Sequence, residues 1–135
     1  MHAMVGASVV DDESVKVLRD KEAASLEAFR MGAATKQNWN DINAAVRIAE
    51  SMAEAGIGPE VMVHAKIAEM HLLDARDRFK RIGKMGTTGP GLQSFKDIIE
   101  YHELQRTSVA RSVYEKHIQK VTNMIRSKSP KIKFL

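Results

Sequence analysis

Apolar residues recur along this chain at alternating steps of three and four, the spacing of one buried face of a helix in a bundle. The most regular run lies within residues 61–82 and consists of Val61, Ala65, Ala68, Leu72, Ala75, Phe79 and Ile82. Similar runs start at Trp39 and at Leu92, and a less regular one precedes them. No run of Val, Ile and Thr alternates at period two between turn residues, as a strand would. The pattern predicts four helices and an all-α fold.

Turn and capping residues predict where the first three helices begin and end. The first helix covers residues 12–33 in this interpretation. Thr35 or Asn38 caps the second helix, because such side chains accept hydrogen bonds from the free backbone N–H groups at a helix start. The Gly-Ile-Gly-Pro segment at 56–59 ends the second helix and starts the third, and Gly83 ends the third.

The last helix is predicted to be the longest. Thr88 or Pro90 opens it, and the apolar pattern continues to about residue 127. A helix over 90–127 would span about 57 Å at about 1.5 Å per residue. Such a helix overhangs its bundle, bends, or breaks near Thr107 and Ser108. We expect self-association through this helix, with a homodimer favoured.

We expect one domain over residues 1–135, folded as an up-down four-helix bundle with an extended C-terminal helix. The third helix is predicted to be central. It has a second apolar flank formed by Val63, Ile67, Met70 and Leu73. A helix that is apolar on more than one side is expected to be largely buried. Residues 1–10 are expected to be flexible, and 129–135 to form a basic tail.

Positive charge is concentrated in the second half of the chain. Residues 76–135 contain 14 Lys and Arg against 5 Asp and Glu, a local net charge of +9, whereas the whole chain carries +4. A field of one sign attracts polyanions. The chain has no cysteine, which excludes disulfides and thiolate metal sites, and no apolar run approaches the ~20 residues that cross a bilayer. We expect a cytoplasmic protein without membrane contact.

The basic region offers six candidate contacts for a partner. They are Arg106, Arg111, Lys116, Lys120, Arg126 and Lys128. On a helical wheel these cations surround the last helix rather than form one stripe. Such a helix would bind nucleic-acid backbone, or an acidic protein, with strong salt dependence and little choice of sequence. The alternative is a solvated surface that is attracted to the acidic first half of the same chain or of another copy.

His102 and Arg106 occupy two successive inward steps of the last helix's apolar face. Buried polar groups need partners, and a buried charge needs one most strongly. Glu22, on the first helix, is the candidate carboxylate. Three roles are open for this pair: fixing the register of the bundle, lining a polar ligand pocket, and catalysis.

The motifs predict no catalytic residue, metal site or cofactor. The loop at 84–91 is rich in glycine, but no Gly-Lys-Ser/Thr closes it and no strand precedes it, so we expect a helix connection rather than a phosphate loop. Neither Glu-x-x-His nor Gly-x-Ser-x-Gly occurs. Two segments permit a helix-turn-helix interpretation. The one at 48–63 would present apolar and acidic groups to DNA, and the one at 104–119 lacks a turn glycine.

Four short strings in the C-terminal two thirds are distinctive. They are Thr-Gly-Pro-Gly-Leu at 88–92, Tyr-His-Glu-Leu-Gln-Arg at 101–106, Ser-Val-Ala-Arg at 108–111 and Tyr-Glu at 114–115. Together they resemble uncharacterised small helical proteins carried by proteobacterial phages and plasmids. The resemblance implies a cytoplasmic, mobile-element setting and no mechanism.

The leading hypothesis is a non-enzymatic, oligomeric helical interaction protein whose basic C-terminal half contacts nucleic acid or an acidic protein. The first alternative is a structural or adaptor oligomer with no role on nucleic acid. The second is a helical bundle that binds a ligand or acts as an enzyme through His102 and Arg106.

Overall fold

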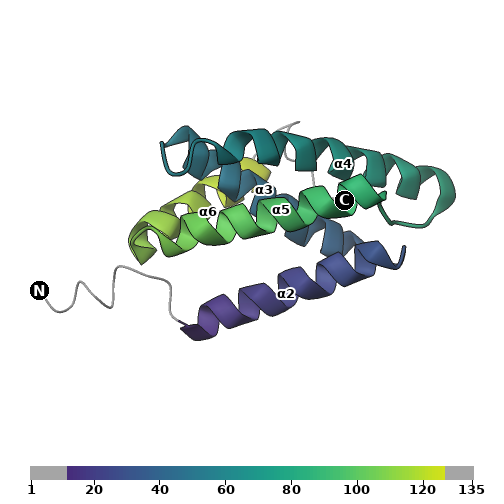
Figure 1. Cartoon of the computed structure of the whole chain (residues 1–135), viewed down its shortest axis with the longest axis horizontal. Helices are drawn as coiled ribbons and strands as arrows, with labels where there is room; N and C mark the ends of the chain where they lie inside the picture. The colour runs from purple at the N-terminus through teal and green to yellow at the C-terminus, as the bar shows by residue number, and fades with distance from the viewer. Residues whose placement is uncertain (1–11, 127–135) are drawn as a thin grey trace, which may run out of the picture.

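The computed structural model describes residues 12–126, and these residues form five helices and no strand. The helices are α2 (Asp12–Arg30), α3 (Lys36–Glu54), α4 (Val61–Ile82), α5 (Gly89–Thr107) and α6 (Arg111–Arg126), as Figure 1 shows. The predicted all-α fold is confirmed. The expectations for residues 1–10, Lys128 and the tail at 129–135 lie outside the described residues, as does the side chain of Arg126.

The helix boundaries follow from local capping. Thr35 caps α3: its Oγ1 accepts from the backbone N–H of Asn38 at 3.2 Å, and the Asn38 side chain accepts from the backbone N–H of Thr35 at 2.8 Å. Thr88 caps α5 by accepting from the Gly91 N–H at 3.0 Å. Gly83 follows α4 with φ of 73°, a left-handed conformation that favours glycine. These three predicted boundaries are confirmed.

The central helix is α3 rather than α4. Among the five described helices, α3 packs against each of the other four, while α2 and α4 lie on opposite sides of it (Figure 1). Trp39 on α3 is buried and donates its indole N–H to the backbone carbonyl of Leu72 on α4, at 2.8 Å. The prediction that the third helix of the chain is central is therefore wrong, because α4 contacts the core with one face only.

The predicted single C-terminal helix is broken in two. α5 ends at Thr107 and α6 begins at Arg111. The Thr107 hydroxyl donates to the Glu103 carbonyl at 2.9 Å, and the Ser108 hydroxyl donates to the Gln105 carbonyl at 2.8 Å. In a continued helix the Gln105 carbonyl would accept from the N–H of residue 109, and hydroxyl-to-carbonyl bonds of this kind weaken and bend a helix. The extended, overhanging helix is wrong over the described residues, because α6 turns back and packs against α3.

The glycine-rich connection between α4 and α5 packs against the core. Met85 is buried in the main core, and its carbonyl accepts from the Ala34 N–H at 3.0 Å. Gly86 passes so close to Gly32 that a Cβ on it would lie 2.9 Å from the Gly32 Cα. The connection therefore closes one end of the bundle, as expected of a helix linker.

Candidate functional site

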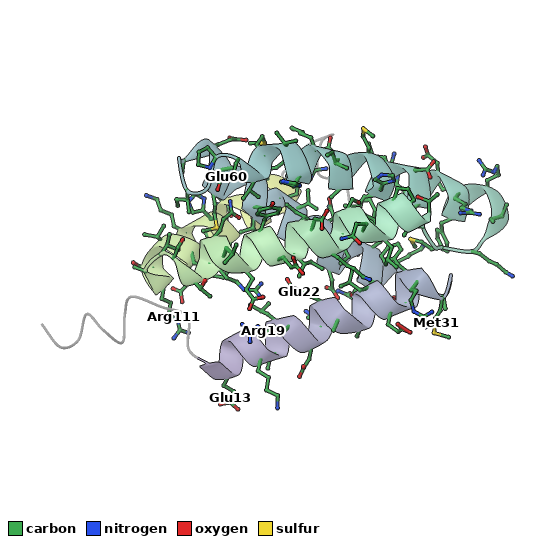
Figure 2. All side chains as sticks on the ribbon, in the orientation of Figure 1. Glu13, Arg19, Glu22, Met31, Glu60 and Arg111 are labelled. Atoms are coloured by element: carbon green, nitrogen blue, oxygen red, sulfur yellow. The ribbon has the colours of Figure 1, made fainter. Side chains whose placement is uncertain are left out.

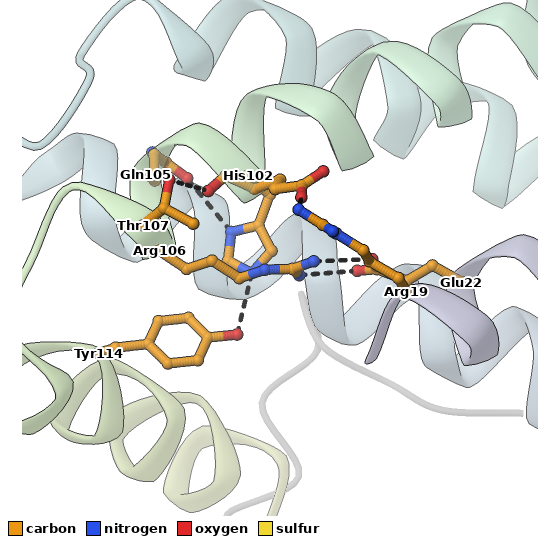
Figure 3. A network of polar contacts seen from close by, with 8 residues as sticks. Arg19, Glu22, His102, Gln105, Arg106, Thr107 and Tyr114 are labelled. Atoms are coloured by element: carbon orange, nitrogen blue, oxygen red, sulfur yellow. Dashed lines mark hydrogen bonds and ion pairs between the residues drawn. The ribbon is translucent and has the colours of Figure 1, made fainter. Parts of the chain in front are cut away.

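A buried polar cluster joins four helices at the end of the bundle where α5 meets α6. Arg106 on α5 is 0% exposed, and its two terminal nitrogens donate to the two carboxylate oxygens of Glu22 on α2, at 3.1 and 3.2 Å (Figure 3). The predicted partnership of Arg106 with Glu22 is confirmed. A bidentate pair of this kind has the geometry that buried charges require. Beside it, Arg19 forms an ion pair with Glu103.

His102 is held in one neutral tautomer by its neighbours. The Gln105 amide N–H group donates to the carbonyls of Ala49 and Ile57, at 3.1 and 2.9 Å. The Gln105 oxygen is therefore the atom that faces His102 Nδ1 at 3.3 Å, so Nδ1 carries the proton. The other ring nitrogen lies 3.3 Å from the Tyr114 hydroxyl and accepts from it.

The protonation of this cluster follows from its burial. Burial, reinforced by the charge of Arg106, lowers the pKa of His102 to about 4. Burial also raises the pKa of Tyr114, which keeps its hydroxyl protonated and able to donate. The cluster is therefore an ion pair beside a neutral imidazole near pH 7.

A cavity of about 100 Å³ adjoins the cluster, and its lining includes Ala45 and Ile48 of α3 together with Glu22 and Tyr114. Arg106 Nε is the one atom of the cluster that has no hydrogen-bond partner among the described residues. Every other polar group named above is bonded to another part of the fold. The cluster thus ties α2, α3, α5 and α6 together, and this geometry favours the register role over a ligand or catalytic role.

The structure places the six basic candidates in different environments. Arg106 is buried, so its prediction as a nucleic-acid or acidic-partner contact is wrong. Arg111 is exposed and bonds to Glu115 at 3.0 Å. Lys116 and Lys120 are exposed on α6, while the side chains of Arg126 and Lys128 lie outside the described part of the chain. The nearby imidazole of His117 faces inward and hydrogen-bonds to the Ser51 hydroxyl at 2.7 Å, and burial lowers its pKa.

A cationic hollow lies at the opposite end of the bundle, where sequence reasoning placed no site. It has a volume of about 360 Å³, and its described lining contains Arg30, Arg78 and Lys84 but no acidic residue. Arg30 is bonded to Glu27. The sequence signal was available, because residues 76–84 contain five cations and one acid.

The second apolar flank of α4 is exposed, contrary to prediction. The exposed fractions are 63% for Val63, 41% for Ile67, 63% for Met70 and 37% for Leu73. We call these four residues the α4 seam. Figure 2 shows the side chains of α4 projecting from the side of the molecule turned away from α2. The prediction failed because α3 and α5 cover only the face of Val61, Ala65, Ala68, Leu72 and Ala75.

Sequence reasoning also missed an ion network between α3 and α4. Arg47 is buried and bonds to Glu50 at 2.8 Å and to Glu69. Lys66 reaches the second oxygen of Glu50 at 2.8 Å, and this bond raises the pKa of Lys66. The i, i+3 spacings of Arg47 with Glu50 and of Lys66 with Glu69 were the local signals of this network.

Within residues 12–126 no three His, Cys, Asp or Glu side chains gather as a metal site, and His64 stacks on Tyr101 with ring centres 4.2 Å apart. None of the described helices is both long and apolar enough to span a lipid bilayer.

In comparisons with known proteins, no family model, no curated protein and no solved structure matches this chain.

Proposed function

We propose that this chain is a non-enzymatic helical interaction protein that binds a helix of another polypeptide through the α4 seam. The observation that carries the proposal is the exposure of the four seam residues on one side of one helix. Their steps of four, three and three are those of a helix face that packs against another helix. The cost of exposing them is removed when a partner helix covers them.

The seam differs from the other exposed apolar residues of the described chain. Val17 on α2 and Leu104 on α5 are 60% and 65% exposed, but each stands on a helix whose other large apolar side chains are mostly covered. Isolated exposed apolar residues are common and need no explanation, whereas a contiguous row marks an interaction surface.

Methionine oxidation tests whether the seam is covered. Met70 in the seam and Met31 after α2 are 63% and 66% exposed in the single chain, so they are a matched pair. A brief peroxide pulse, followed by peptide mass spectrometry, should oxidise Met70 more slowly than Met31 in purified protein or in cell extract. The Ile67→Glu variant should remove the protection. Equal rates for the two methionines in both samples would refute the proposal.

A second candidate function is binding of nucleic-acid backbone, and the cationic hollow favours it. Arg78 and Lys84 line a concave surface without an acidic neighbour among its described lining residues, which suits a phosphate group. Affinity for a short DNA or RNA duplex should fall steeply with salt. The double variant Arg78→Ala, Lys84→Ala should weaken binding more than the matched pair Lys116→Ala, Lys120→Ala on α6. Undetectable binding at about 50 mM salt, where phosphate contacts are strongest, would exclude this function.

A further inference from the structure

We propose that the occupant of the α4 seam is α4 of a second copy of this chain, packed antiparallel about a two-fold axis at Met70. This inference rests on the proposed function, because it names the partner of the same surface. Such an axis places residue 70 − n of one copy level with residue 70 + n of the other. Met70 then faces Met70, and Ile67 lies level with Leu73.

The charges beside the seam favour the antiparallel arrangement. Lys66 lies on the exposed side of α4 before Met70, and Asp74 lies on it after Met70. The proposed axis brings Lys66 of one copy level with Asp74 of the second copy. It also brings Glu60 level with Lys80. In a parallel pair each of these residues would lie level with the same residue of the second copy, and the two like charges would repel each other.

The intramolecular contacts of these charges are compatible with the pairing. Lys66 already bonds to Glu50, but an ammonium group has three donors and can bond to two carboxylates. Asp74 is exposed and free to approach it. Farther from the axis, Val63 of one copy lies level with Asp77 of the second copy. The Asp77 carboxylate is 3.7 Å from the guanidinium of Arg76 in its own chain. The apolar contact is therefore confined to the middle of α4, and a weak dimer is expected.

Packing elsewhere argues against the last helix as the dimer contact. The inward residues of α6 include Tyr114, His117 and Val121, and all three are buried. They are used against α3 and α5 within one chain. Ile118 is only marginally exposed, at 36%. We therefore place the interface on α4.

Single cysteines test the geometry, because the chain has none of its own. Met70→Cys should form a disulfide-linked dimer under mild oxidation, since the axis brings the two positions together. Val63→Cys should not, because positions 63 of an antiparallel pair lie about 21 Å apart along the helix axis, and a disulfide needs Cα atoms within about 7 Å. Mixed Val63→Cys and Asp77→Cys chains should cross-link with each other. Val17→Cys is the control: position 17 is exposed on α2, so this variant gives the rate of disulfide formation by random collision.

A charge exchange tests the register independently. Asp74→Lys should lower the association constant about tenfold in sedimentation equilibrium, because two symmetry-related pairs become repulsive together. Adding Lys66→Asp to this variant should restore association. Because Lys66 also bonds to Glu50, urea unfolding of each variant verifies that the fold is intact.

The outcomes separate this inference from the proposed function. Rapid cross-linking of Val63→Cys with itself would indicate a parallel pair, and a dimer that no seam cysteine cross-links would place the contact elsewhere. A purified chain that stays monomeric also overturns the inference. If Met70 is nevertheless protected in cell extract, the proposed function stands with a different partner. If Met70 is protected in neither sample, both fail.

Discussion

The buried cluster and the α4 seam invert the usual distribution of side chains. At the cluster, a charged pair and an imidazole sit among apolar residues, with Arg106 0% exposed. At the seam, four apolar residues face outward on α4. His102 and Arg106 stand four residues apart on α5, and the seam residues stand four, three and three residues apart on α4, so each set lies on one face of its helix. Periodicity thus identifies a face of a helix, while neighbouring helices decide whether that face is covered.

The two arrangements differ in whether their cost is offset within the chain. The cost of burying a charge is several kcal/mol, and Glu22 offsets it only because both carboxylate oxygens meet Arg106. Full burial of a large apolar side chain is worth roughly 1.5–3 kcal/mol, and the seam residues forgo part of this in the single chain because they stay 37–63% exposed. The buried Arg106 therefore has its counter-charge within the chain, whereas none of the described helices covers the seam.

The largest expected effect is at the cluster. Glu22→Gln should destabilise the fold by about 3–5 kcal/mol, because it leaves a buried guanidinium without a counter-charge. Urea unfolding measures the loss, with the exposed Glu13→Gln on the same helix as control. Replacing both members, Glu22→Leu with Arg106→Met, should recover most of the stability. A loss below about 1 kcal/mol for Glu22→Gln would show that water reaches Arg106.

A pH series should show the second effect. Unfolded His102 takes up a proton at its ordinary pKa of 6.5, whereas folded His102 does so at about 4. Above pH 6.5 both states are neutral, so stability is full there, and it falls as the pH drops from about 6.5 to 4 by roughly 3 kcal/mol. His102→Asn should flatten this part of the unfolding profile. His117, whose pKa is also lowered, contributes in the same direction, so an unchanged slope in the variant would assign the effect to that residue.

The smallest expected effect is at the seam. Ile67→Gln should change the unfolding free energy of the monomer by no more than about 0.5 kcal/mol, as at other surface sites. Measurement at low protein concentration keeps association out of the comparison. The buried Leu72→Ala on the opposite face of α4 is the contrast and should cost about 2–5 kcal/mol. A large loss for Ile67→Gln would mean that the seam is covered within one chain.

Local features of the fold were predictable from the sequence. Thr35, Thr88 and Gly83 set helix ends through contacts within three or four residues, so their roles are visible in the residue types. A break near Thr107 and Ser108 was one of three predicted outcomes for the last helix, and it is the one observed.

Features that depend on distant contacts were less predictable. The need of Arg106 for a carboxylate was predictable, and so was Glu22, but the contacts of His102 with Tyr114 and Gln105 depend on how α6 turns back. The exposure of the α4 seam depends on which face of α4 is covered by α3 and α5. No periodicity within one helix contains that information.

The indole of Trp39 has a practical consequence. It is the only tryptophan of the chain, it is 2% exposed, and its N–H is bonded to α4 across the centre of the bundle. Its fluorescence therefore reports the contact between α3 and α4 without any label. Emission should be blue-shifted and resistant to acrylamide quenching, and it should move to longer wavelength once these two helices separate.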